Sequence, residues 1–310
     1  MDIFGNNGPN VLFGTPFADN IFGLGGNDTL FGNDGNDLLN GGTGNDYMAG
    51  GAGNDTYVVD NISDTVFEAA GAGFDRVNAS VNHVLEDNVE SLFLFGGATA
   101  GVGNGLANTI VGNGNANFLA GLGGNDFLDG GLGNDHLDGG VGNDTLLGGA
   151  GNDGLSGRAG ADWLNGGAGN DYLDGGTGND TLIGGLGNDT LDGGAGNDRF
   201  FFAEAGAANW DSIVDFSHFA DTIALSSSLD GVAGGGIAGL AFTAGVLNAG
   251  WYFEGAGFNG NGLQLSGIFN DTTTGNIWYN RTSGVAFDSL LLANVGAGSA
   301  ALDNTDFVLA

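Results

Sequence analysis

Aspartate recurs every nine residues along two stretches of the chain, each time just after a glycine-rich run. The copy at residues 175–183 reads GGTGNDTLI. A carboxylate is a hard anionic ligand of the kind that Ca²⁺ prefers, and glycine permits tight turns that leave backbone carbonyl oxygens exposed. The spacing therefore predicts sites for a hard divalent cation at the glycine-rich turns.

The nine-residue period defines the elements that must position these aspartates. Six units cover residues 5–58, and eleven cover residues 103–201. Glycines at positions one, two and four of each unit permit backbone conformations that a Cβ would disfavour. Position eight is apolar in every unit, and positions seven and nine must point the other way if the segment is a strand. Each unit is thus expected to form one turn and one short strand, and two successive units are expected to form one coil.

The repeat Gly-Gly-X-Gly-X-Asp-X-Leu-X resembles the RTX, or haemolysin-type, calcium-binding repeat. The resemblance implies a parallel β-roll in which Ca²⁺ lies between successive coils, held by position-six aspartates and backbone carbonyls. The implied aspartates are Asp19, Asp28, Asp37, Asp46, Asp55, Asp126, Asp135, Asp144, Asp153, Asp162, Asp171, Asp180, Asp189 and Asp198. The implied carbonyls are those of Gly26, Gly35, Gly44, Gly53, Gly124, Gly133, Gly142, Gly151, Gly160, Gly169, Gly178, Gly187 and Gly196. One ion in each gap between paired aspartates gives roughly ten Ca²⁺ ions.

Four units depart from this pattern at the positions that matter. Position six is asparagine at Asn10, Asn108 and Asn117, and we expect those turns to hold no ion. Phe17 stands where the unit of residues 14–22 should have glycine, which makes Asp19 a doubtful ligand.

The composition restricts the classes of partner. The 310 residues include 37 Asp+Glu but only 4 Lys+Arg, for a formal net charge of -33. Such a polyanion should repel nucleic acid and anionic membranes and attract cations. Hydrophobic residues make up 41% of the chain, so a core can form once the charge is neutralised. Cysteine is absent, which excludes disulfide bonds.

The fold class that these patterns predict is all-β, with two parallel β-roll blocks. We expect the first block at residues 1–58 and the second at 103–201. Residues 59–102 break the period and read as a β-rich spacer, which either joins the blocks or continues the stack as a wider coil. Residues 202–310 read as a C-terminal β-rich domain that caps the second block.

The C-terminal domain also resembles the targeting region of type I secretion substrates. The segments behind this resemblance are residues 276–280 and 303–310, while residues 211–216 and 221–226 resemble the segment that closes RTX rolls. The N-terminal residues lack the basic and apolar regions of a signal peptide. The type I secretion machinery is therefore an expected partner, and the expected location is extracellular. The apolar stretch at residues 236–253 is interrupted by glycines and reads as short strands and turns.

No catalytic constellation is apparent, and we expect a protein that is not an enzyme. His83, His136 and His218 are the only histidines, and no hydrolase, zinc-protease or phosphate-loop motif occurs. The leading hypothesis is a secreted protein that folds on binding Ca²⁺. One alternative is a calcium-bridged surface-layer, matrix or adhesive component, with cell-surface or matrix polysaccharide or a second copy of the chain as its partner. The outward aromatic residues at position seven are expected either to cover the thin roll or to line a sugar- or protein-binding face. Others are membrane activity and a cryptic enzyme site in residues 202–310.

Overall fold

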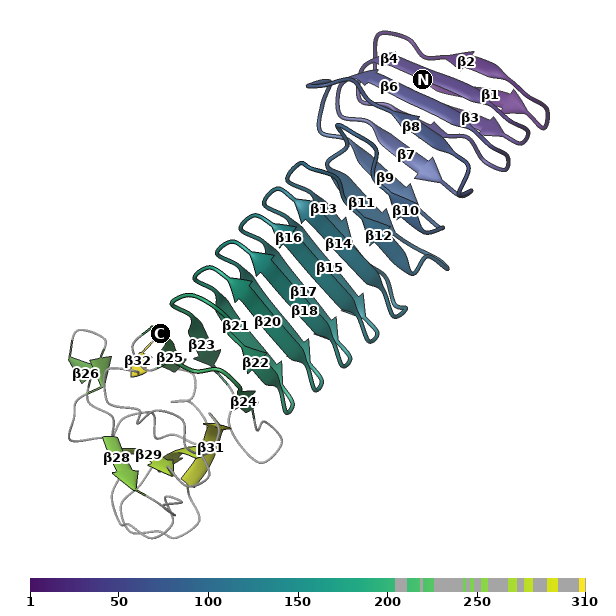
Figure 1. Ribbon diagram of the computed structural model, residues 1–310. Coiled ribbons are helices and arrows are strands. Elements are labelled where there is room, and N and C mark those ends of the chain that lie inside the picture. The colour runs from purple at the N-terminus through teal and green to yellow at the C-terminus, as the bar shows by residue number, and fades with distance from the viewer. Residues whose placement is uncertain are drawn as a thin grey trace. The chain divides into compact units, whose positions relative to one another are not determined.

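The computed structural model describes residues 1–203, 211–217 and 220–225, together with the later strands named below. It divides into two units, Met1–Thr145 and Leu146–Ala310. Each regular element in the described residues is a β-strand (Figure 1). Among the residues that the structure describes, no helix has the length and apolar character needed to cross a membrane.

The first unit consists of short strands separated by tight turns. They are β1 (Asp2–Asn6), β2 (Val11–Phe13), β3 (Asn20–Leu24), β4 (Thr29–Asp34), β5 (Leu38–Asn40), β6 (Tyr47–Ala52), β7 (Thr56–Val59), β8 (Thr65–Phe67), β9 (Arg76–Ala79), β10 (His83–Val84), β11 (Ser91–Leu94), β12 (Ala100–Val102), β13 (Thr109–Val111), β14 (Phe118–Gly123), β15 (Phe127–Leu132) and β16 (His136–Val141). Strand β17 (Thr145–Ala150) begins at the last residue of this unit.

The second unit continues the same kind of strand and then becomes less regular. Its strands are β18 (Gly154–Ala159), β19 (Trp163–Ala168), β20 (Tyr172–Thr177), β21 (Thr181–Leu186), β22 (Thr190–Asp192), β23 (Arg199–Phe202), β24 (Asp211–Ile213), β25 (Thr222–Leu225), β26 (Phe242–Thr243), β27 (Val246–Leu247), β28 (Tyr252–Gly255), β29 (Gly267–Asp271), β30 (Asn276–Asn280), β31 (Ser289–Asn294) and β32 (Phe307–Leu309).

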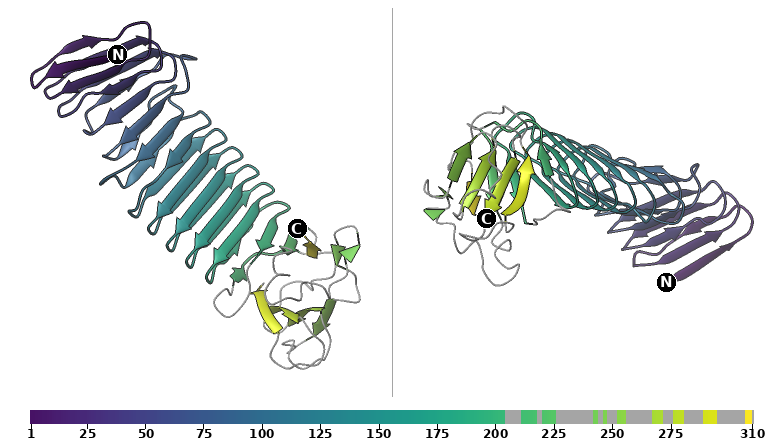
Figure 2. Two further views of the ribbon diagram at one scale, coloured as in Figure 1. Left: turned by 180° about the vertical axis from the view of Figure 1, so that it is seen from behind. Right: turned by 90° about the horizontal axis from the view of Figure 1, so that it is seen from below.

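Strands that are two apart along the chain pair in parallel, so each coil gives one strand to each of two facing sheets. In the first unit Ile3 pairs with Ile21 and Leu12 with Leu30, so each residue faces its equivalent two repeats further on. In the second unit Leu164 pairs with Leu182 at the same offset. The strands of each unit lie side by side in all views (Figures 1 and 2). The predicted parallel β-roll is confirmed.

The core of each unit is a column of single inward residues, one from each strand. Position-eight side chains such as Leu30, Leu128 and Leu173 are fully buried, while most of their neighbours at positions seven and nine are half-buried. The two-residue alternation of a strand produces this pattern. A single nonapeptide therefore buries little apolar surface, and the core forms only when nonapeptides stack.

The glycines do not all have the same conformation. Position two has a positive φ, as at Gly176 (95°), and so does position four, as at Gly178 (139°). The glycine at position one has an ordinary φ. The expectation that all three glycines adopt a backbone conformation unfavourable to other residues is therefore wrong for position one. Even Leu24 and Arg158 adopt a positive φ at position two (78° and 74°), which shows that the turn imposes this geometry.

Residues 59–102 continue the stack, as one of the two sequence interpretations allowed. Strands β7, β9, β11 and β13 are neighbours in one sheet. Thr56 pairs with Arg76, Arg76 with Ser91, and Ser91 with Thr109, so one longer coil and one shorter coil precede the return of the regular length. The inward residues of these coils, such as Val77 and Leu92, remain buried.

The strands expected in the C-terminal region are present where the structure describes it. Strand β24 pairs in parallel with β22 and β31, and β25 pairs in parallel with β23 and β32. Within residues 236–253, where short strands and turns are expected, the structure describes β26, β27 and the start of β28. His218 and most of residues 226–310 lie outside the described part.

Candidate metal sites

The position-six aspartates are buried along the edges of the stacked coils. All fourteen are between 1% and 3% exposed. An ionised carboxylate is rarely buried so deeply unless it has a charged or hydrogen-bonded partner. The partners of these side chains therefore decide what the sites are able to bind.

One carboxylate oxygen of each aspartate in the ladder is held by the neighbouring coil. The backbone N–H of Asp28 donates to Asp46 Oδ1 at 2.7 Å, and the N–H of Asp180 donates to Asp198 Oδ1 at 2.9 Å. Because each regular coil has 18 residues, position-six residues two nonapeptides apart lie directly above one another. The same hydrogen bond therefore repeats along each edge of the stack. Position six thus forms a ladder that fixes the orientation of each carboxylate.

In nine of these aspartates the second oxygen is left without a donor. It is buried and lacks a hydrogen-bond partner in Asp28, Asp37, Asp46, Asp55, Asp126, Asp171, Asp180, Asp189 and Asp198. A buried acceptor without a partner carries the full cost of its desolvation, on the order of 1–3 kcal/mol and more when charged. Each of these oxygens is therefore free to accept an external ligand.

The spare oxygen converges with a backbone carbonyl at the glycine of position one. An ideal Cβ at Gly175 would lie 2.6 Å from Asp180 Oδ2 and 2.7 Å from the carbonyl oxygen of Gly193. The same pair of oxygens, one unit's carboxylate and the position-one carbonyl of the next coil, surrounds Gly23, Gly32, Gly121 and Gly166. Position one needs glycine because these two oxygens occupy the space of a side chain.

These position-one carbonyls were missed by the sequence analysis, which named the carbonyls of position four. The position-four carbonyls also lie against the next coil: that of Gly26 occupies the place where a Cβ of Gly44 would stand. They stay predicted ligands. A carbonyl oxygen has no side-chain signature. The signal that could have revealed the position-one carbonyl is the glycine that recurs at position one. Its φ is ordinary, so backbone conformation does not explain why a glycine recurs there.

Burial and repulsion between like charges make these carboxylates hard to ionise without a cation. Burial, with neighbouring carboxylates adding to it, raises the pKa of Asp126 and Asp171 to about 7. The same causes raise the pKa of Asp46 and Asp198 to about 6. Hard anionic oxygens that are buried, spare and close to carbonyls fit a hard divalent cation such as Ca²⁺.

The comparison with known families agrees with this donor set. The family model of the RTX calcium-binding nonapeptide repeat matches residues 4–39, 22–57, 102–137, 138–173, 147–182 and 174–204, just over half of the chain. The chain belongs to the RTX calcium-binding repeat family. A comparison with curated protein sequences finds no match. The predicted RTX repeat is thus confirmed, with calcium as the metal of the repeats.

The asparagine-containing RTX units satisfy their turns without a spare anionic oxygen. The Nδ2 amide of Asn108 donates to the carbonyl of Val89 at 3.3 Å, and that of Asn117 donates to the carbonyl of Ala98 at 3.4 Å. An amide donor thus contacts backbone carbonyls of the preceding coil. That the asparagine units hold no ion stays a prediction.

Both carboxylate oxygens of Asp19 have donors. Oδ1 accepts from the Met1 amino group at 2.6 Å, and Oδ2 accepts from the Thr15 hydroxyl at 2.8 Å. The hydrogen bond from the amino group is the main reason that the pKa of Asp19 falls to about 2. A side chain that is already paired in this way is a weak candidate for a metal ligand.

The ladder of position-six carboxylates extends beyond the RTX repeats. Asp64 and Asp75 accept from the backbone N–H of Asp46 and Asp55 at 3.0 and 2.7 Å. In the second unit Asp221 accepts from the N–H of Asp198 at 3.0 Å. The sequence analysis did not name them. The signal was an Asp-X-apolar triplet before each strand, which matches positions six to eight of a unit.

Proposed function

We propose that this RTX chain is a secreted, non-enzymatic protein whose repeats fold on binding roughly ten Ca²⁺ ions outside the cell. The position-six aspartates and the backbone carbonyls of the turns would hold the ions. The observation that carries the proposal is the series of buried carboxylate oxygens without donors, many of them beside a carbonyl of the next coil.

The proposed coupling of folding to calcium follows from the electrostatics of the stack. Carboxylates one coil apart are separated by about 4.8 Å along the sheet. At an effective dielectric constant of about 20, each such pair repels by roughly 3 kcal/mol. Several such terms exceed the margin by which a domain is stable, typically about 5–15 kcal/mol. Metal binding would then supply the free energy of folding.

The proposed location follows from the same dependence. A chain that needs many moderate-affinity Ca²⁺ sites stays unfolded where the free ion is scarce and folds where it is abundant. Export of an unfolded chain by the type I secretion machinery fits this behaviour. The resemblance of the C-terminal region to type I targeting segments supports it.

Far-UV circular dichroism of the full-length chain tests the proposal. We expect a disordered spectrum in metal-free buffer and a β spectrum in millimolar Ca²⁺, with equimolar Mg²⁺ as the control. Native mass spectrometry of the folded chain should count roughly ten ions. A β spectrum that survives complete removal of Ca²⁺ would contradict the proposed coupling.

A further inference from the structure

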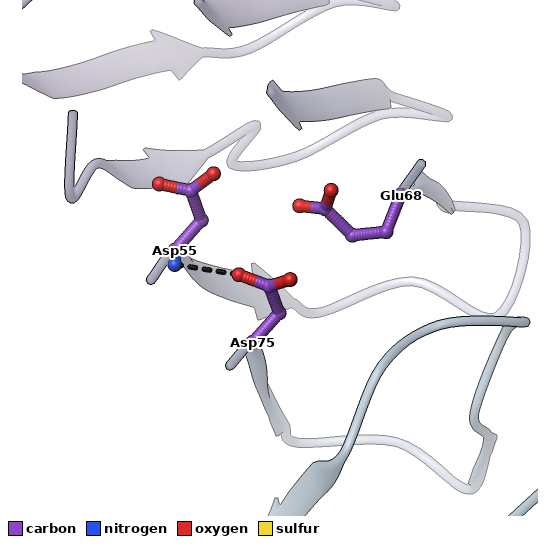
Figure 3. Close-up of side chains that lie close together, drawn as sticks. All are labelled: Asp55, Glu68 and Asp75. Atoms are coloured by element: carbon purple, nitrogen blue, oxygen red, sulfur yellow. Dashed lines mark hydrogen bonds between the residues drawn. The ribbon is translucent and has the colours of Figure 1, made fainter. Parts of the chain in front are cut away.

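Three buried carboxylates meet where the regular repeats end in the first unit. Asp55, Glu68 and Asp75 are only 1%, 4% and 1% exposed. Each offers one oxygen that lies within 4.8 Å of those of the other two (Figure 3). Oxygens that share one Ca²⁺ at about 2.3–2.6 Å lie within about 5 Å of one another, so this separation suits a common ion.

Each carboxylate has one oxygen held by a donor and one oxygen without a partner. Asp55 Oδ1 accepts from the backbone N–H of Asp37, and Asp75 Oδ1 accepts from that of Asp55, both at 2.7 Å. Glu68 Oε1 accepts from the Tyr57 hydroxyl. The remaining oxygens, Oδ2 of both aspartates and Oε2 of Glu68, are buried and lack donors. The three side chains are thus oriented, and each keeps an anionic oxygen spare.

The strand register explains why a glutamate is present here. Strand β8 pairs with β6, and Phe67 lies opposite Ala49. Glu68 therefore follows Gly50 by one coil, at the place where a regular repeat has the glycine of position one. That glycine contributes a backbone carbonyl to the other gaps. Here a carboxylate takes its place.

Tyr57 completes the arrangement from the core. It stands at position eight, where the other RTX units have an aliphatic residue, methionine or phenylalanine, and it is fully buried. Its hydroxyl accepts from the backbone N–H of Gly50 at 2.7 Å and donates to Glu68. Hydrogen bonds of this kind fix the orientation of ligating carboxylates in metal sites.

We propose that Asp55, Glu68 and Asp75 form a three-carboxylate Ca²⁺ site that is distinct from the repeat gaps. Two of its three ligands lie outside every nonapeptide, so the site does not follow from the repeat pattern. It shares with the proposed function only the premise that buried carboxylates of this chain hold Ca²⁺. Three anionic ligands instead of two raise the affinity of an oxygen site, and this site therefore loads at lower Ca²⁺ than the gaps.

A crystal structure of the full-length wild-type chain with Tb³⁺ in place of Ca²⁺ tests the location directly. An anomalous peak between Asp55, Glu68 and Asp75 supports the site. Peaks in the repeat gaps with none at the three carboxylates would overturn this inference and leave the proposed function standing. Absence of peaks from the gaps would instead count against the proposed function.

Substitution tests the order of loading. Glu68→Gln removes one charge but keeps an acceptor for Tyr57, and Asp87→Asn removes one charge from an exposed residue of the same segment. Isothermal titration with Ca²⁺ should show the tightest binding step weakened at least about tenfold in E68Q and unchanged in D87N. Two folded variants with the same titration curve would contradict the site. If E68Q does not fold in Ca²⁺, the wild-type Tb³⁺ structure decides.

Discussion

Replacing Gly175 with alanine tests whether position one is reserved for two converging oxygens. The new Cβ would lie 2.6 Å from Asp180 Oδ2 and 2.7 Å from the Gly193 carbonyl oxygen, and ordinary contact begins at 3.4 Å. Both oxygens would therefore have to move by well over half an ångström. The carboxylate is able to rotate, but the carbonyl belongs to the backbone that directly follows β22 and moves only with its coil.

The expected cost has two parts. Inserting a methyl group into a packed site typically costs about 1–3 kcal/mol. Displacement of both oxygens also removes one ion site, and at a Ca²⁺ concentration about 100-fold above the dissociation constant each site contributes about 2.7 kcal/mol. The free energy of unfolding should therefore fall by about 4–6 kcal/mol in saturating Ca²⁺.

The matched control is the same substitution at Gly114. No atom lies within 4 Å of its ideal Cβ, and its φ is not left-handed. G114A should leave stability unchanged or raise it by up to about 1 kcal/mol, because alanine restricts the unfolded chain.

Urea unfolding at a fixed Ca²⁺ concentration, followed by circular dichroism, compares G175A with G114A. A Ca²⁺ titration of each variant locates the midpoint of folding. We expect a lower urea midpoint and a higher Ca²⁺ midpoint for G175A alone. Equal midpoints for the two variants would refute the assignment of position one to the metal site.

Three further outcomes follow from the same geometry. Burial raises the pKa of Asp126 and Asp171 to about 7, so the folded metal-free chain binds protons more tightly than the unfolded chain. This stabilisation is complete below the unfolded pKa near 4 and is lost as the pH rises through about 7. Circular dichroism of the metal-free chain should therefore show more β-structure at pH 5 than at pH 8. The reverse trend would contradict this prediction. Asn117→Asp would place a carboxylate beside the Gly130 carbonyl and should add one Ca²⁺ ion by native mass spectrometry, while an unchanged count would argue against the asparagine interpretation. Leu128→Ala empties a fully buried position of the core column and should lower the free energy of unfolding in Ca²⁺ by about 2–5 kcal/mol, as measured in urea; a loss below about 1 kcal/mol would show that the column is not the core.

The regular part of the fold could be predicted because one residue of every nine points inward. The period fixes the strand, the turn and the two-repeat coil together, and a slip of one residue would bury a polar side chain. The inward columns follow from this, with Leu128 in the first unit and Leu173 in the second, as does the buried ladder that contains Asp180. The left-handed backbone at positions two and four was also foreseen, from glycine's tolerance of it.

The irregular part could not be predicted, because its coil length is not repeated. The long offset from Thr56 to Arg76 and the short one from Arg76 to Ser91 occur once each, so the sequence has no second copy to align with. Glu68 shows the consequence. Only the register of β6 with β8 reveals that it replaces a position-one glycine.

Buried position-six groups in the described residues fall into three classes by their partners, and these classes underlie the proposed dependence of the fold on calcium. Asn108 and Asn117 use their own amides, and Asp19 uses an amino group. Most of the remaining aspartates need a charge that the chain cannot supply, because 37 acidic residues face only 4 basic ones. Protons and divalent cations are the two candidates, and with pKa values of about 6 at Asp46 and about 7 at Asp126 protons no longer serve above neutral pH. Above neutral pH the proposed function therefore assigns the counter-charge of these carboxylates to metal ions in solution.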